Sequence, residues 1–392
     1  MYNKYFTEEK NIRRDKIVEK MLAANVDAIL LSDNANLYYT SERVFSGYTY
    51  ITKDKEELFF VKRPVGLTGD DVIYIRKPEN IPDALAERGL ALPKTIALEL
   101  DITSYNDILR LEKLFPGAQV ANGTAIMRAV RAVKTDYEIA KLKESGAHHD
   151  RAYRHIPRIY RYGMTDVELQ IEIERQLRLE GSLGQFRISG QSMEIFMGNL
   201  LCGDNADNPT PYDFAMGGAG LSTSLPVGCN GTAIKPGNTV MVDLGGNFTG
   251  YMTDMTRTFY LGDLSDLTKK AHETSIKICH TIKEMAKPGV EAKALYEKAM
   301  EIVTEAGLEE YFMGHRQKAG FIGHGVGIEI NEFPVLAPKS KHILEAGNVI
   351  AVEPKFVIPH VGAAGIENTY LVTENGMEQI TNYPEEISQL FI

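Results

Sequence analysis

The sequence has no tryptophan and only three cysteines in 392 residues, namely Cys202, Cys229 and Cys279. Their odd number and wide spacing, without a CxxC pair, argue against a disulfide framework or a zinc knuckle and are typical of a reducing compartment. No run approaches the roughly 18 apolar residues of a membrane span, and the N-terminal segment MYNKYFTEEKNIRRDK lacks the apolar core of a signal peptide. We therefore predict a cytoplasmic protein.

The chain also lacks an excess of basic residues. Its formal net charge is −10, whereas binding to nucleic acid requires concentrated Lys and Arg. Hydrophobic residues make up 44% and charged residues 24%, which is near the average for globular proteins. We therefore expect a folded protein that binds neither nucleic acid nor a membrane.

At this length, two domains are the default expectation. Residues 1–130 alternate short helical and strand patterns, which predicts a small α/β domain. A charged amphipathic helix from Asp136 to about His155 begins the second domain, residues 131–392. Further helices near 166–181, 266–286 and 291–307 are interleaved there with strand pairs, which predicts an α+β fold with antiparallel sheet.

A stretch rich in Gly, Asn, Pro and Asp follows Cys202 and continues to Gly228 without periodicity. Such a long irregular segment in a compact domain is often a lid or a binding loop. Its segment MGGAGLS lacks the Lys of a phosphate loop and the strand that precedes a dinucleotide fingerprint. We do not expect it to bind a nucleotide.

The residues that suggest chemistry begin with a hairpin, TVMVDLGGNFTGYMTDMTRTFYL, which starts at Thr239. If its turn is centred between Phe248 and Thr249, Asp243 and Asp254 lie opposite each other. Like charges in directly opposed positions are destabilising unless something positive lies between them. Two solvated surface aspartates are the alternative interpretation of this hairpin alone.

A second β-rich pair of segments favours a metal site. If the second hairpin is centred on His360, Glu353 lies opposite Glu367. Glu353 lies in the apolar context VIAVEP, where an unpaired charge is costly. Four carboxylates in one place could hold two divalent ions, and His324 in the glycine-flanked segment GFIGHGVGIEI offers an imidazole ligand.

These segments together resemble the pita-bread metallopeptidase family, which includes methionine aminopeptidase, prolidase, aminopeptidase P and creatinase. The motifs VDLGGNFTGYMTDMTRTF, GHGVGIEINEFP, AVEP and GIENTYLVT occur in the order and at the spacing of this family, and the resemblance covers about residues 134–392. The N-terminal half, with KIVEKMLAANVDAILLSDNANLYYTSE, resembles the creatinase and prolidase N-terminal domain. The expected fold is therefore an α+β pita-bread catalytic domain preceded by a smaller α/β domain.

The resemblance implies a role for each candidate residue. Asp243 would bind one ion, Asp254 and Glu367 would bridge two ions, and His324 and Glu353 would bind the other. Glu353 would also carry the proton of the attacking water. The ions could be Mn, Co, Zn or Fe, because this donor set suits them all. A homodimer is also implied by the resemblance.

Four positions depart from the family pattern. Val227 in LPVG stands where the peptidases have the His of PHG, and Asn331 in NEFP stands where they have the His of HEEP. Gly320 and Gly365 replace a further His and the Arg of RIED. Asn331 can still donate a hydrogen bond to an oxyanion, although a neutral amide cannot act as a general acid. His360 and His315 are the nearest candidates to replace the missing histidines in contact with substrate.

Three functions remain open at this point. The first is a dinuclear metallopeptidase of Xaa-Pro dipeptidase or Xaa-Pro aminopeptidase type, which would hydrolyse short peptides with a metal-activated water. The second is a non-peptidase hydrolase or a lyase that uses the same metal site, which the four departures suggest. The third is a binding module without turnover, against which the five intact candidate ligands argue.

Overall fold

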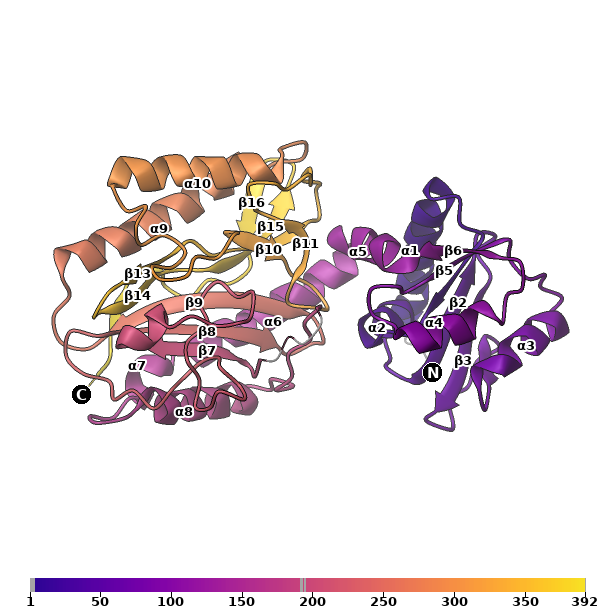
Figure 1. Ribbon diagram of the computed structural model, residues 1–392, viewed down its shortest axis with the longest axis horizontal. Helices are drawn as coiled ribbons and strands as arrows, with labels where there is room; N and C mark the ends of the chain where they lie inside the picture. The colour runs from indigo at the N-terminus through magenta and orange to yellow at the C-terminus, as the bar shows by residue number, and fades with distance from the viewer. Residues whose placement is uncertain (1–3, 191–192, 194, 392) are drawn as a thin grey trace. The chain divides into compact units, whose positions relative to one another are not determined.

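The computed structural model describes residues 4–190, 193 and 195–391, which form two compact units, Met1–Arg131 and Ala132–Ile392 (Figure 1). Each unit contains its own sheets and its own hydrophobic core. Among the described residues, no helix is both long enough and apolar enough to cross a lipid bilayer.

The first unit is a mixed six-stranded sheet with helices, which confirms the predicted α/β class. Its strands follow the order β4-β3-β2-β1-β5-β6, and β1 pairs antiparallel with β2 but parallel with β5. The strands are β1 (Ala28–Leu31), β2 (Ser46–Thr52), β3 (Glu57–Arg63), β4 (Val72–Tyr74), β5 (Thr95–Leu98) and β6 (Gln119–Asn122). The helices are α1 (Lys4–Ala23), α2 (Asn34–Ser41), α3 (Ile81–Glu87), α4 (Tyr105–Glu112) and α5 (Gly123–Ala132).

Helix α2 was not predicted from the sequence, because NANLYYTS is short and contains weak helix formers. The structure shows what holds it. Asp33 caps its N-terminus by accepting a hydrogen bond from the backbone N–H of Ala35, and the helix is largely buried. Capping and packing therefore override the local propensity here.

The second unit contains three antiparallel or mainly antiparallel sheets between helices. The sheets have the orders β17-β9-β8-β7, β11-β10-β12-β15-β16 and β13-β14. Their strands are β7 (Gly198–Cys202), β8 (Thr239–Asn247), β9 (Met252–Tyr260), β10 (Gly323–Gly325), β11 (Glu332–Val335), β12 (Val349–Val352), β13 (Lys355–Ile358), β14 (Gly362–Gly365), β15 (Asn368–Thr373), β16 (Gly376–Gln379) and β17 (Ser388–Gln389).

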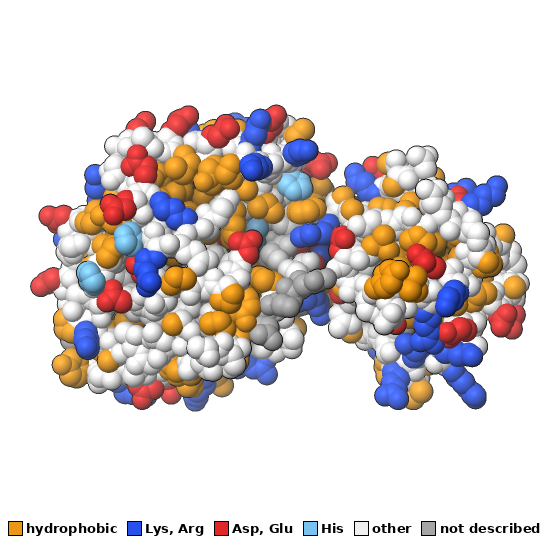
Figure 2. Space-filling model, in the orientation of Figure 1, with side chains coloured by type: hydrophobic (Ala, Val, Ile, Leu, Met, Phe, Trp, Pro, Cys, Tyr) orange, Lys and Arg blue, Asp and Glu red, His pale blue; other side chains and the backbone are white. Residues whose placement is uncertain are grey.

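Helices cover these strands from two sides. Helices α6 (Asp136–Tyr153) and α8 (Asp166–Leu179) pack against β7, β8 and β9, and the short α7 (Ile156–Ile159) lies beside α8. Helices α9 (Asp266–Met285) and α10 (Ala292–Ala306) lie above the strands in Figure 1, where α9 packs on β13 and β14. On the face shown in Figure 2, this unit displays acidic and basic side chains side by side.

Helix α6 starts where the charged pattern predicts it. Thr135 accepts a hydrogen bond from the backbone N–H of Glu138, whose carboxylate accepts one from the N–H of Thr135 in return. This capping box satisfies two N–H groups that the first helical turn leaves without partners. Thr165 and Glu168 repeat the same arrangement at the start of α8.

Candidate metal centre and active site

Two hairpins and one short strand bring the five predicted ligands together. Asp243 lies on β8, Asp254 on β9 and His324 on β10, while Glu353 and Glu367 lie in the chain between strands. Their ligand atoms form two overlapping groups, each with all atoms within 4.8 Å of one another. The groups are Asp254, His324 and Glu367, and Asp243, Glu353 and Glu367.

The predicted register of the first hairpin is wrong by two residues. Asp243 pairs with Thr256, and Asp254 pairs with Gly245. The centre of the turn lies one residue further along the chain than predicted, because β8 ends at Asn247 and β9 begins at Met252, with Gly250 at a positive φ between them. A shift of two residues preserves the face to which each side chain points, so both aspartates still lie on one side of the sheet as a diagonal pair.

The predicted register of the second hairpin is confirmed. Val352 pairs with Asn368 in one ladder, and Lys355 pairs with Gly365 in the next. Both pairs are centred on His360, as predicted. Glu353 and Glu367 occupy corresponding positions in the gap between the two ladders, where their backbone leaves one sheet and enters another.

A lysine lies among these carboxylates, and sequence reasoning missed it. The Nζ of Lys355 is 2.8 Å from Oδ2 of Asp243, 2.8 Å from Oε2 of Glu353 and 3.2 Å from Oε2 of Glu367. An ammonium has three N–H donors, so these three acceptors use all of them. The side chain is fully buried. A signal was present, because a Lys inside the apolar run VEPKFVIP needs a buried partner as much as Glu353 does.

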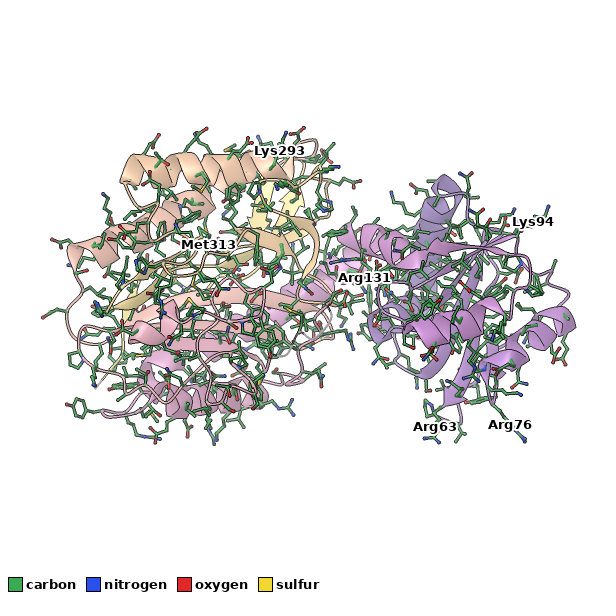
Figure 3. The ribbon with its side chains drawn as sticks, viewed as in Figure 1. Arg63, Arg76, Lys94, Arg131, Lys293 and Met313 are labelled. Atoms are coloured by element: carbon green, nitrogen blue, oxygen red, sulfur yellow. The ribbon has the colours of Figure 1, made fainter. Side chains whose placement is uncertain are left out.

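The backbone around Lys355 is fixed by its neighbours. Its carbonyl oxygen accepts a hydrogen bond from the N–H of Met313, which lies beside the β13–β14 hairpin (Figure 3). Across the hairpin lies Gly365, the position where the family pattern has an arginine. A Cβ at Gly365 would meet the carbonyl oxygen of Pro354 at 2.7 Å. The hairpin therefore carries its basic side chain at position 355, while position 365 has no room for one.

The other part of the cluster has fewer donors. Oε2 of Glu367 accepts hydrogen bonds from Lys355 and from Thr256 Oγ1, at 2.7 Å for the latter, but Oε1 is buried without a hydrogen-bond partner among the residues that the structure describes. Oδ2 of Asp254 lies 3.8 Å from Nε2 of His324. A buried carboxylate oxygen without a donor is costly, and a bound cation would satisfy it.

His324 is oriented toward these carboxylates. Its Nδ1 lies 3.1 Å from the carbonyl oxygen of Gly325, to which it donates when protonated at that nitrogen. Nε2 is 3.3 Å from Oε1 of Glu353. Burial opposes protonation of the ring, but Glu353 and Asp254 raise the pKa of His324 to about 9, so Nε2 carries a proton that a bound metal ion would replace. Metal-binding histidines are commonly fixed in this way by a backbone carbonyl.

The pKa values of the cluster show an excess of negative charge. Burial raises the pKa of Asp254 to about 7, and the charge of Asp243 adds to the shift. Burial also raises the pKa of Glu367 well above its usual range, with Asp254 contributing. Burial opposes ionisation of Glu353 as well, but Lys355 and His324 lower its pKa to about 2. Lys355 and His324 alone therefore do not balance the four carboxylates.

A cavity opens beside the cluster and reaches Asp243, Asp254, His324 and Glu353. Most of its remaining wall is apolar, formed by Phe186, Ile188, Met193, Ile195, Phe214, Met216, Phe321 and Ile330. Asp213, Phe214 and Met216 belong to the irregular stretch after Cys202, so part of that stretch does face the site. A small apolar group next to the carboxylates would fit this wall.

Asn331 also lines this cavity, but its amide is already engaged. Oδ1 accepts a hydrogen bond from the N–H of Ser189, and Nδ2 donates to the carbonyl oxygen of Ser189, both at 2.7 Å. The amide thus holds the segment that carries Phe186 and Ile188. One N–H of the amide remains for a further bond.

The two tentative substrate residues lie elsewhere. His360 is at the exposed tip of the second hairpin, where Nδ1 is 3.3 Å from Asp204. His315 contacts Asp207 at 3.0 Å through Nδ1. Neither residue lines the cavity beside the carboxylates. Val227 lines an apolar pocket next to α8, which adjoins that cavity and shares Ile195, Gly198 and Asn199 with it.

Comparisons with known proteins agree with this architecture. Residues 140–374 match the model of metallopeptidase family M24, and residues 13–133 match that of the creatinase/prolidase N-terminal domain. The chain is 27% identical over 384 residues to the Xaa-Pro dipeptidase of Pyrococcus horikoshii, covering 96% of this chain and 99% of the relative.

Solved structures show the same fold. The Xaa-Pro dipeptidase from Bacillus anthracis superposes with a TM-score of 0.78 at 25% identity, covering 97% of this chain and 100% of that one. The X-Pro aminopeptidase from Thermotoga maritima also gives 0.78, at 22% identity and 96% and 99% coverage. At that identity the second likeness concerns the fold alone.

Fold and family models together define a two-domain metallopeptidase with a pita-bread catalytic domain, as the resemblance implied. The chain belongs to metallopeptidase family M24, and it carries the creatinase-type N-terminal domain.

Proposed function

We propose that the protein is a Xaa-Pro peptidase that hydrolyses short peptides at the bond before proline. The observation that carries this proposal is the buried cluster of four carboxylates and His324 at the end of an apolar cavity. The relatives that span nearly the whole chain support the substrate class, since the first of them is an Xaa-Pro dipeptidase. They favour a peptidase over the alternative of a non-peptidase hydrolase or a lyase.

Family M24 implies divalent metal ions, and part of the cluster fits one. The unpartnered Oε1 of Glu367, the oriented Nε2 of His324 and the carboxylate of Asp254 form one of the two groups of close ligand atoms. Oε1 of Glu353 lies beside Nε2 of His324 and would complete the set. A bound divalent ion would supply polarisation of the peptide carbonyl and a more acidic water.

The protein's own groups supply the remaining functions. Glu353 is ionised at neutral pH, so its carboxylate can take the proton of the attacking water and return it to the proline nitrogen as the C–N bond breaks. The apolar wall, including Phe186 and Phe321, would hold the substrate's apolar groups and exclude bulk water. The free N–H of Asn331 is available to the carbonyl oxygen.

Hydrolysis of Xaa-Pro dipeptides and of longer Xaa-Pro peptides tests the proposal, with Mn or Co supplied. Cleavage of a dipeptide is measured as free proline, and cleavage of a longer peptide as the released N-terminal residue. We expect Asp254→Asn to lower release more than about 100-fold, since even outer ligand partners are worth 10- to 100-fold. Asp263→Asn, an exposed aspartate outside the site, is the matched control and should retain activity. Release from dipeptides alone would identify a dipeptidase, and release from longer peptides an aminopeptidase.

Folded, metal-loaded protein that cleaves neither the dipeptides nor the longer peptides would overturn the proposal. Equal release from Asp254→Asn would overturn the assignment of the site. The homodimer that the resemblance implies is part of the proposal and is tested separately, by light scattering of the purified protein.

A further inference from the structure

The Lys355 ammonium occupies one of the two places in the cluster where a cation would be expected. Of the two groups of close ligand atoms, one consists of Asp243, Glu353 and Glu367. Those are the three residues that Lys355 contacts, at 2.8, 2.8 and 3.2 Å. The other group, with Asp254 and His324, has no such ammonium.

We propose that Lys355 takes the place of one divalent ion, so that each chain binds a single ion beside it. That ion would be held by Asp254, His324, Glu353 and Glu367. The proposal rests on the metal site of the proposed function, but it concerns the number of ions and not the peptide cleaved. It departs from the two ions that the family resemblance implies.

The first argument is steric. A divalent ion among these oxygens would bind them at roughly 2.0 to 2.2 Å, in the space between carboxylates that the Nζ of Lys355 occupies. The side chain cannot simply swing into solvent, because it is fully buried and its backbone is held by Met313 and by pairing with Gly365.

The second argument concerns the two oxygens of each glutamate. Oε2 of Glu353 and Oε2 of Glu367 both accept from Lys355. Oε1 of Glu353 lies beside His324, and Oε1 of Glu367 has no hydrogen-bond partner. Each glutamate therefore has one oxygen committed to the ammonium and one available to an ion, so it would bridge two cations of different kinds.

The net charge of the carboxylate cluster also supports a single divalent ion per chain. Four buried or half-buried carboxylates face the Lys355 ammonium and the His324 ring, which is neutral once its Nε2 binds an ion, so three negative charges are in excess when all four carboxylates are ionised. One divalent ion would offset two of these charges, and the electrostatic demand for a second ion beside Lys355 is correspondingly small.

The number of Mn ions bound to the full-length protein tests the proposal. The protein would be stripped with a chelator and dialysed against MnCl2. Bound Mn would be measured by elemental analysis, and its electron paramagnetic resonance spectrum recorded. We expect one Mn per chain and the six-line spectrum of an isolated ion. Two Mn per chain with the spectrum of a coupled pair would overturn this inference and leave the proposed function standing.

Two substitutions of Lys355 test whether its side chain excludes a second ion. Lys355→Ala removes the charge and opens space, so we expect a second Mn and the spectrum of a coupled pair. Lys355→Met removes the charge but keeps most of the volume, so we expect no second ion. A single isolated Mn in a folded Lys355→Ala protein would show that Lys355 does not exclude the second ion. If Lys355→Ala fails to fold, the wild-type stoichiometry and spectrum decide.

The number of Mn ions bound per chain is measured independently of peptidase activity. One Mn per chain without cleavage of any Xaa-Pro peptide would support this inference and overturn the proposed function. No bound Mn in folded protein would overturn this inference and the metal site of the proposed function together.

Discussion

Nη1 of Arg257 lies 2.8 Å from the backbone carbonyl oxygen of Glu367, to which it donates a hydrogen bond. The guanidinium is 1% exposed and also donates to the carbonyl oxygens of Tyr383 and Pro384 and to the side chain of Asn368. Arg257 thus ties β9 and the segment after β16 to the chain that carries a candidate ligand.

We expect Arg257→Lys to destabilise the protein by about 3 kcal/mol or more. A lysine keeps the charge but places its donors at one point, so several buried carbonyl oxygens would lose their donors, at about 1–3 kcal/mol each. Urea unfolding measures the loss, and Arg158→Lys at an exposed position is the matched control. An Arg257→Lys protein as stable as that control would contradict this role.

The pair of hydrogen bonds between Asn331 and Ser189 predicts an effect on substrate binding. Asn331→Asp keeps the shape and can still accept from the N–H of Ser189, but it loses the donor to the Ser189 carbonyl. The wall that carries Phe186 and Ile188 should then loosen. Because a lost buried hydrogen bond costs about 1–3 kcal/mol, we expect a rise in KM for Xaa-Pro peptides of about fivefold to 100-fold.

The split between KM and kcat separates this positioning role from direct catalysis. A fall in kcat with unchanged KM would instead indicate that Asn331 contacts the reacting carbonyl in the transition state. Asn375→Asp, in an exposed turn, controls for the added charge and should change neither constant.

The two hairpins show why the sequence predicts the face on which a carboxylate lies more reliably than the register of its strand. The face of each carboxylate follows from strand alternation, which a two-residue error in the first hairpin leaves intact. The error itself came from the position of the turn, whose centre lies one residue beyond the predicted one, with Gly250 at a positive φ. The turn of the second hairpin is centred on His360, and its register was predicted correctly.

The polar contacts within the site were less predictable than the strands that carry its carboxylates. Lys355 follows Glu353 by two residues, yet its contact with Asp243 depends on how β8 packs against β13 and β14, which no local pattern specifies. The pair of hydrogen bonds between Asn331 and Ser189 likewise joins residues that are 142 positions apart. Long-range pairing of polar groups in a core is decided by tertiary packing, so local sequence patterns do not predict it.

The buried His149 should make the stability of the protein depend on pH. Its ring is fully buried on α6, where Nδ1 lies 3.1 Å from Thr253 Oγ1 and a Cβ at Gly246 would collide with the ring. Burial, with the charge of Arg257 contributing, lowers its pKa to about 3.

Because the folded pKa lies below the unfolded value of about 6.5, His149 contributes stability that is fully present above pH 6.5 and is lost as pH falls toward 3. At pH 5 the loss should be about 2 kcal/mol. Urea unfolding at pH 8 and pH 5 measures it. Between these values, wild-type protein should lose about 2 kcal/mol more than His149→Phe, whose ring does not titrate.

The comparison uses the difference between two pH values, so any stability that His149→Phe loses with the contact to Thr253 cancels. The exposed His155 offers the control, since His155→Gln should keep the wild-type dependence. An identical loss in wild type and His149→Phe would place the acid sensitivity elsewhere, with the buried carboxylates of the site the next groups to test.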